Sequence, residues 1–362
     1  MRITIIAVAA AGLCALAAAP GPNPQKKKKE DITQTLQLPK DLPPAVTGEP
    51  RRFTFHTTAL SGKGLLSAQV REALKNLAHD EAGASVLHIR AFVAGSGDLR
   101  RVRDLVSEVF TDHKQPLPAL SLVRAGALPV EGAQVVLEAI GAGKKEVNPQ
   151  GLAFLPAFPA SSENPTDPVP PLAARSLDRL RQALNTAGAE PGGVVRVTCF
   201  LSSLDNLADT RKLVEADYPR AALDYVQTQR SPGRAFAACE AVARLRSDPG
   251  RPVQLVPGDG EPQAAVIGAR QVVLTGTQVS YGYQEADSRL AFERLARTLE
   301  SMGVTGRDVA FARYYSLAEP IAAQVRKIRP DFFPSAASSV VTFEGLPSMD
   351  AGFAVDVVAV KP

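Results

Sequence analysis

The sequence contains little cysteine, with three residues among 362. Cys14 lies in an apolar N-terminal run that we interpret below as a removable segment, so only Cys199 and Cys239 remain after it. Two cysteines form one bridge at most, which excludes a small domain held together by a disulfide framework. Because both lie in apolar strand-like runs, we favour two buried thiols, with a single bridge between them as the alternative.

Histidine is also scarce, and the patterns of several catalytic classes are absent. The four histidines, His56, His79, His88 and His113, have neither the short spacing nor the neighbouring cysteines of a zinc site. The sequence contains no Gly-x-Ser-x-Gly segment for a hydrolase nucleophile, and its glycine-rich turns lack the Lys-Ser/Thr pair of a phosphate-binding loop. We therefore expect no metal site and no cofactor.

The excess of positive charge is small and lies at one end of the chain. The whole sequence has 41 basic and 37 acidic residues, a formal net charge of +4. Residues 1–31 hold five of the basic residues and two of the acidic ones, which leaves the remainder close to neutral. A nucleic-acid-binding face needs clustered Lys and Arg to neutralise phosphates, so we expect no nucleic acid partner.

Residues 1–19 have the pattern of a secretory signal peptide, with a positive charge at Arg2, an apolar run and an Ala15-Leu16-Ala17 cleavage pattern. An uncleaved anchor is the alternative, because an apolar run of about 17 residues is at the lower limit for a membrane-spanning helix. Residues 20–47, rich in proline and lysine, are expected to form an extended linker. These patterns predict a secreted or periplasmic protein that has no membrane contact after cleavage.

The rest of the chain repeats itself three times, with proline and valine residues at recurring spacings of seven and six. The three sets are Pro116, Val123 and Pro129; Pro219, Val226 and Pro232; and Pro334, Val341 and Pro347. The second and third copies also match upstream at an offset of 115 residues, for example at Leu180 and Leu295. We therefore predict three modules, at residues 48–143, 144–248 and 249–362.

Each copy predicts the same order of secondary structure. Amphipathic helices are expected at 65–82, 172–187 and 287–302, strands at 86–93, 194–201 and 309–317, and second helices at 99–110, 207–218 and 321–332. A strand pair precedes the first helix, and a hairpin, at 120–125 and 134–140 in the first copy, closes the unit. The fold class is α+β, and three such sheets can bury their helix-free faces against each other about a pseudo-threefold axis.

Residues 109–123, followed by Leu128-Pro129 and by Leu137-Glu138-Ala139-Ile140, resemble the signature of the YjgF/RidA/UK-type family, also called endoribonuclease L-PSP. The second copy keeps Cys239-Glu240-Ala241 and the third keeps Leu346-Pro347. The resemblance covers residues 50–362 and implies three tandem, degenerate RidA-like modules of the chorismate-mutase-like fold. Members of the family form trimers, and those that hydrolyse enamines and imines bind substrate in clefts between subunits.

The departures from the family pattern concern its chemistry. The resemblance places the family's carboxylate-binding arginine at Leu120, Leu223 and Ser338, so this arginine is missing from all three copies. The glutamate that is thought to position the attacking water corresponds to Val136, Ala238 and Ala354, and it is missing as well. A second acidic residue survives in each copy, as Glu138, Glu240 and Asp356.

Some polar residues remain as ligand-binding candidates. Arg103, Arg211 and Arg326 recur at one place in the second helix, where the family can have a ligand-contacting asparagine, although a solvated helix face also explains them. Glu240 is a further candidate, and so is Tyr281, which with Tyr283 lies in a loop where the family can have a cleft-covering aromatic residue. The catalytic residues themselves cannot be assigned from the sequence.

These observations predict an exported, monomeric pseudo-enzyme or scaffold that binds a small molecule in clefts between its modules. Loss of the anion-binding arginine and the water-positioning acid removes groups that typically contribute several kcal/mol to catalysis. The alternative is an enamine/imine deaminase, a hydrolase acting on small 2-imino acids or related amides, with Arg103, Arg211 or Arg326 as substitute anchors. A nuclease, as the older family label suggests, fits poorly with nearly neutral modules.

Overall fold

The computed structural model describes residues 38–80 and 84–361, and residues 39–362 belong to one compact unit. The predicted signal peptide and most of the predicted linker lie outside the described residues. Over the part of the chain that is described, no helix is long and apolar enough to cross a membrane. The class is α+β, as expected, with three sheets.

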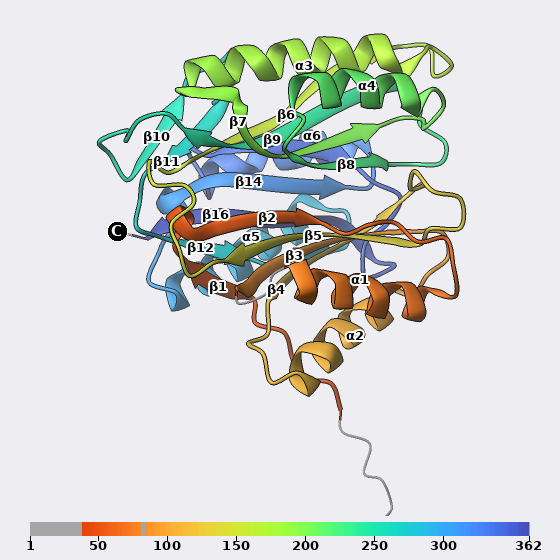
Figure 1. Ribbon diagram of the computed structural model, residues 1–362, viewed down its shortest axis with the longest axis horizontal. Coiled ribbons are helices and arrows are strands. Elements are labelled where there is room, and N and C mark those ends of the chain that lie inside the picture. Colours follow the sequence, from red (N-terminus) through yellow and green to blue (C-terminus); the bar gives the residue numbers. More distant parts are fainter. Residues whose placement is uncertain (1–37, 81–83, 362) are drawn as a thin grey trace, which may run out of the picture. The chain divides into compact units, whose positions relative to one another are not determined.

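Helices pack on each of the three sheets (Figure 1). Each is amphipathic, as α2 illustrates: Asp98 caps its first turn by accepting a hydrogen bond from the backbone N–H of Arg100, and its buried face includes Leu105 and Phe110. The helices are α1 (Leu66–Asp80) and α2 (Leu99–Asp112) on the first sheet, α3 (Val169–Thr186) and α4 (Leu207–Asp217) on the second, and α5 (Glu285–Ser301) and α6 (Glu319–Ile328) on the third.

The three sheets share one strand order. Sheet 1 is β2-β5-β3-β4, with β2 (Phe53–Thr57), β3 (Ser85–Ala94), β4 (Ala119–Ala125) and β5 (Val135–Ala142). Sheet 2 contains β6-β9-β7-β8, with β6 (Leu152–Ser162), β7 (Ala189–Leu201), β8 (Ala222–Gln227) and β9 (Ala235–Leu245). Sheet 3 contains β12-β16-β14-β15, and β13 also pairs with β16. Its strands are β12 (Gln271–Thr275), β13 (Gln278–Tyr281), β14 (Val309–Ser316), β15 (Ala337–Thr342) and β16 (Ala351–Lys361).

The predicted closing hairpin is wrong. In each sheet the strand after the second helix, such as β4, runs parallel to the strand before that helix, β3. The last strand, β5, instead pairs antiparallel with β3 on its other edge. The helix between β3 and β4 provides the crossover that a parallel pair needs, so each unit contains a β-α-β element.

Short strands extend two of the sheets across the predicted module boundaries. β1 (Ala45–Gly48) pairs with β12 of sheet 3, and its first three residues belong to the predicted linker. β10 (Val253–Val256) and β11 (Ala264–Ile267) lie in the predicted third module but extend sheet 2, where β11 pairs with β6. Each added strand supplies partners to backbone groups that would otherwise be unpaired at a sheet edge.

Hydrophobic clusters lie on both faces of the sheets. Three clusters join one sheet each to its own helices. Two more draw residues from all three sheets, and Phe92, Phe200 and Tyr315, at equivalent places in β3, β7 and β14, belong to one of them. The ring of Phe343 lies within 6 Å of each of these three rings, centroid to centroid. The helix-free faces of the sheets are therefore buried together.

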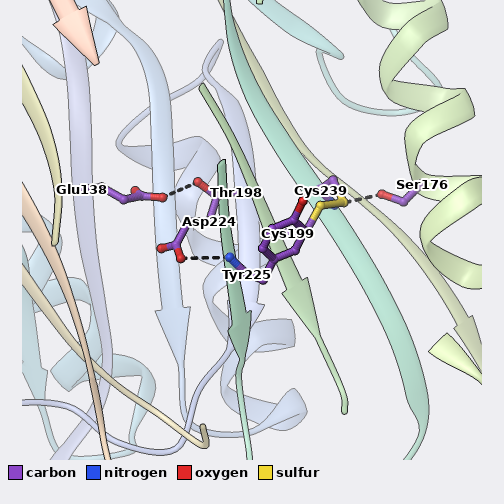
Figure 2. Close-up of a disulfide and its surroundings, with 7 residues drawn as sticks. All are labelled: Glu138, Ser176, Thr198, Cys199, Asp224, Tyr225 and Cys239. Atoms are coloured by element: carbon purple, nitrogen blue, oxygen red, sulfur yellow. Dashed lines mark hydrogen bonds between the residues drawn. A yellow bond between two sulfur atoms is a disulfide. The ribbon is translucent and has the colours of Figure 1, made fainter. Parts of the chain in front are cut away.

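Cys199 and Cys239 form a disulfide, so the preference for two free thiols is wrong (Figure 2). The two residues are direct partners in the antiparallel register of β7 and β9, with their Cα atoms 4.1 Å apart. Directly opposed residues of antiparallel strands are close enough for such a bridge. The sequence could not indicate this pairing because it depends on the register of two strands 40 residues apart.

Replacing both cysteines with alanine should lower the free energy of unfolding by about 2–4 kcal/mol, because the bridge restricts a loop of some 40 residues in the unfolded chain. Urea unfolding of the wild type and the double variant, each with and without reductant, measures this. Reductant should move the wild-type midpoint to that of the variant and leave the variant unchanged. A wild-type midpoint that reductant does not move would contradict the bridge.

Candidate functional site

The three acidic residues that the family resemblance singled out occupy one register position in the three sheets. Across the antiparallel pairs, Glu138 lies opposite Arg90, Glu240 opposite Thr198, and Asp356 opposite Arg313. On the parallel side, the same three partners lie next to Ser121, Asp224 and Ser339. All of these side chains are buried. Together with the buried Arg196 and His88, which lie two residues before Thr198 and Arg90, they form what we call the central charge cluster.

Hydrogen bonds in the central charge cluster connect each sheet to the next. Thr198 of sheet 2 donates to Glu138 of sheet 1, as Figure 2 shows. Ser339 of sheet 3 donates to Glu240 of sheet 2 over 2.9 Å, and Ser121 of sheet 1 donates to Asp356 of sheet 3 over 2.7 Å. These hydrogen bonds join sheet 1 to sheet 2, sheet 2 to sheet 3 and sheet 3 to sheet 1, so the contacts between the sheets form a closed ring.

Arg90 is the most connected member of the cluster. Its Nε donates to Glu138 Oε2 over 2.6 Å, and its Nη1 lies 2.8 Å from Glu240 Oε1. The guanidinium also lies 5.0 Å from the ring centroid of Phe92. Arg90 thus joins a carboxylate of its own sheet to one of sheet 2, and Arg313 makes the corresponding link between Glu240 and Asp356.

The charges in the cluster shift the pKa values of its members. Burial alone would raise the pKa of Glu240, but Arg90, Arg313 and Arg196 outweigh this effect and lower it to about 2. Burial lowers the pKa of His88 to about 4, with the three arginines adding to the effect and Asp356 opposing it. For Arg196, burial and the neighbouring arginines lower the pKa to about 10.

Asp224 differs from the other carboxylates of the cluster. Burial, together with the negative charge of Glu138, raises the pKa of Asp224 well above its usual value, against the opposing effects of the Tyr225 N–H, Arg90 and Arg196. This shift favours the neutral form of Asp224. Three arginines, Arg90, Arg196 and Arg313, face the other three acidic residues of the cluster, Glu138, Glu240 and Asp356.

Three clefts lie where the strand after each second helix, at one edge of its sheet, meets the first strand of the common four-strand order in a different sheet. We name them by sheets: β4 meets β12 and β13 at the 1/3 cleft, β8 meets β2 at the 2/1 cleft, and β15 meets β6 at the 3/2 cleft. Their cavity volumes are about 490, 230 and 670 Å³, in that order.

The 1/3 cleft has an apolar floor and a cationic side. Leu120 and Leu122 of β4 line it together with Tyr281, while Arg100 and Arg103 of α2 provide its positive charge. Its lining requires a glycine at Gly276, because a Cβ there would lie 2.6 Å from the carbonyl oxygen of Leu120. Arg103 Nη2 pairs with Asp41 at 2.9 Å, but the Asp41 side chain is 97% exposed and belongs to a surface segment.

The other two clefts carry charges of both signs. Arg211 and Glu215 of α4 line the 2/1 cleft, and the Arg211 guanidinium lies 5.6 Å from the ring centroid of Tyr225. In the 3/2 cleft, Arg326 pairs with Glu319 at 2.8 Å. The three clefts, formed by equivalent strands, therefore differ in charge.

The structure places the predicted site residues as follows. Arg103, Arg211 and Arg326 line one cleft each, and Tyr281 lines the 1/3 cleft, whereas Tyr283 belongs to none of these linings. Glu240 is buried in the central charge cluster and lines none of the three clefts. Their ligand-binding roles remain predictions.

Four of the six positions that the resemblance assigns to the family's missing arginine and glutamate line the clefts. Leu120 and Leu223 line the 1/3 and 2/1 clefts, and Val136 and Ala238 line the 2/1 and 3/2 clefts. Ser338 instead accepts a hydrogen bond from Arg329, whose guanidinium pairs with Glu261. No cleft therefore has an arginine at the family position.

The buried arginines and Asp224 were not among the candidate residues expected from the sequence. Arg90, Arg196 and Arg313 each stand within an apolar strand, and a lone charge in such a run is the signal that could have indicated a buried ion pair. Asp224, in the strand Ala222–Gln227, has the same signal. Within 38–80 and 84–361, no group of three or more His, Cys, Asp or Glu residues is arranged to hold a metal ion.

Comparison with known proteins gives structural neighbours only. No protein-family profile and no curated protein matches the chain. Among solved structures, a member of the YjgF/YER057c/UK114 family from Mycobacterium tuberculosis matches 30% of this chain and 99% of its own, with 20% identity and a TM-score of 0.24. YyfB of the Rid protein family from Yersinia pestis matches 31% of this chain and 100% of its own, with 16% identity and a TM-score of 0.28.

A third solved structure, a putative endoribonuclease L-PSP from Entamoeba histolytica, is 17% identical to this chain. It matches 30% of this chain and 94% of its own, with a TM-score of 0.24. Each of these neighbours is similar to about one third of the chain.

Replacing His88 with glutamine should make the protein less sensitive to mild acid. The pKa of His88 is about 4 in the folded chain and near 6.5 in the unfolded chain, so the unfolded state binds more protons between these values. Wild-type stability should therefore fall as pH decreases from 6.5 to 4, by up to about 3 kcal/mol from this residue. Urea unfolding at several pH values measures the slope, and equal slopes for both proteins would contradict the assignment.

Proposed function

We propose that residues 48–362 are three fused modules of the YjgF/RidA type, at 48–143, 144–248 and 249–362, arranged about a pseudo-threefold axis. The repeated spacings and the family-like segment in the first copy support this proposal. It is further supported by the common strand order of the three sheets and by the equivalent positions of Glu138, Glu240 and Asp356. The cyclic order of the clefts agrees with a trimer-like arrangement.

The function that the geometry supports best is small-molecule binding in the clefts by an exported pseudo-enzyme that acts as a monomer. The observation that carries this proposal is the lining of the clefts. Each is open, yet the places of the family's carboxylate-binding arginine and water-positioning glutamate are occupied by residues such as Leu120, Leu223 and Val136. An apolar side chain can contact a ligand but can neither bind a carboxylate nor orient water.

The 1/3 cleft is the best candidate for an anionic ligand. Arg100 and Arg103 line it, and no Asp or Glu is among its lining residues. The exposed Asp41, which pairs with Arg103, can be displaced by a ligand carboxylate at little cost, since exposed ion pairs contribute little stability. The apolar floor formed by Leu120 and Leu122 suits a short hydrocarbon chain.

Changing Arg103 to glutamine should weaken the binding of butyrate and 2-oxobutyrate about tenfold or more, because a charge-assisted hydrogen bond is lost. Arg101→Gln is the matched control, since Arg101 pairs with Glu108 and does not line the cleft. Calorimetric titration of the purified protein measures the affinities. Equal losses in both variants, or no binding by the wild type, would overturn an anion site in this cleft.

The alternative function is an enamine/imine deaminase, which the presence of Arg103, Arg211 and Arg326 in the three clefts supports. We expect the protein to leave the hydrolysis rate of a freshly generated 2-imino acid at its value in buffer. Stopped-flow spectroscopy of the imine measures this rate. A rate enhancement that Arg211→Gln abolishes would establish the deaminase instead.

A further inference from the structure

The segment just before β1 forms one wall of the 1/3 cleft. Leu42, Pro43 and Pro44 are among the lining residues of this cleft. We call residues 38–44 the strap. Its C-terminal end is fixed in sheet 3, because the carbonyl oxygen of Pro44 accepts a hydrogen bond from the N–H of Gly276 over 2.9 Å and β1 pairs with β12. The strap therefore reaches the cleft from the side of the third sheet.

Two polar contacts hold the other end of the strap to α2 of the first sheet. The carbonyl oxygen of Lys40 accepts a hydrogen bond from Ser107 Oγ over 2.7 Å, and Asp41 Oδ1 pairs with Arg103 Nη2 at 2.9 Å. Arg103 and Ser107 are four residues apart on α2, so both contacts lie on one helix face. The side chains of residues 38–41 are exposed. Loss of the pair at Arg103 therefore removes one of these two contacts from an exposed segment.

The other two cleft arginines have contacts of a different kind. Arg326 pairs with Glu319 of its own helix, α6, and the guanidinium of Arg211 lies over the ring of Tyr225. The partner of Arg103 instead belongs to a separate segment that forms a wall of the same cleft. A change in what binds Arg103 can therefore move the strap.

The Asp41 carboxylate is the same chemical group as that of a carboxylate ligand. Both bind a guanidinium through charge-assisted hydrogen bonds, so they compete for Arg103. Because β1 keeps Asp41 close to the cleft, it competes at an effective concentration on the order of millimolar. An exposed ion pair contributes little stability, so a ligand that also makes apolar contacts with Leu120 and Leu122 can displace it.

We propose that the strap is a built-in competitor for the 1/3 cleft. Asp41 occupies Arg103 in the free protein, and an anionic ligand replaces Asp41 and loosens the strap from α2. This inference rests on the proposed function, since it assumes that the cleft binds a small anion, and it adds a means of regulation to that site. Ligand binding and the position of residues 38–44 are coupled, so any contact that holds the strap against α2 weakens ligand binding.

Changing Asp41 to asparagine should tighten butyrate binding about two- to fivefold, because the competing carboxylate is lost and an exposed ion pair is weak. Asp331→Asn is the matched control, since Asp331 forms an exposed ion pair with Arg289 at the same distance of 2.9 Å and neither residue lines a cleft. Calorimetric titration of the full chain measures both affinities. Equal affinities in the two variants, or weaker binding by Asp41→Asn, would overturn the inference.

Trypsin cleavage after Lys40, followed by mass spectrometry of the whole chain, reports the strap directly. Cleavage of a protected segment follows the population in which it is open. Butyrate should speed this cleavage in the wild type, and Arg103→Gln should speed it without ligand, whereas Arg101→Gln should not. A short peptide substrate shows whether butyrate affects trypsin itself, and urea unfolding shows whether each variant is folded. Slower cleavage with butyrate, or equal cleavage of the two arginine variants, would overturn the inference.

Failure of this inference can be distinguished from failure of the proposed function. If butyrate binds in a manner that depends on Arg103, but Asp41→Asn leaves its affinity unchanged, only the role of the strap is wrong. If butyrate does not bind to the wild type or to Asp41→Asn, the anion site fails and the inference fails with it.

Discussion

The ion pairs of Arg90 with Glu138 and Glu240 are the interaction on which the rest of the structure depends. A buried ion is costly unless it is fully paired, and removing one partner of a buried pair typically destabilises a protein by about 3–5 kcal/mol. Glu240 comes from sheet 2, whereas Arg90 belongs to sheet 1, so the full set of ion pairs of this arginine requires contact with sheet 2. The same holds for Arg313 of sheet 3, which also pairs with Glu240. The central charge cluster thus makes the folding of each sheet dependent on its neighbours.

A single chain permits a cluster that identical subunits could not form. On an axis relating three identical chains, every residue occurs three times, and three copies of Arg196 beside three copies of Arg90 would concentrate positive charge in a buried place. In this chain the equivalent positions hold different residues. Sheet 2 has Thr198 where sheet 1 has Arg90. At the position of Arg196 in sheet 2, sheet 1 has His88 and sheet 3 has Phe311. These differences bring three arginines together with three carboxylates.

The sequence predicted what depends on local pattern. The helix expected at 65–82 is α1 (Leu66–Asp80), and that at 287–302 is α5 (Glu285–Ser301), because each has an apolar stripe with a glycine close to its C-terminus. What it missed depends on contacts distant in sequence. The pairing of β1 with β12 joins Ala45 to Thr275, and the disulfide depends on the register of β7 and β9. The raised pKa of Asp224 depends on its burial and on Glu138, Arg90 and Arg196 from three other strands, so no short segment indicates it.

Asp224 connects the central charge cluster to the chemistry of a cleft. It lines the 2/1 cleft, yet the groups that determine its protonation, Glu138, Arg90 and Arg196, belong to the cluster. Three arginines already pair with Glu138, Glu240 and Asp356, so burial and the charge of Glu138 prevail at Asp224 and raise its pKa. The composition of the core therefore influences the protonation of a residue that lines a cleft. In the first and third sheets, Ser121 and Ser339 at the same position donate instead to Asp356 and Glu240, so these donors are already used within the core.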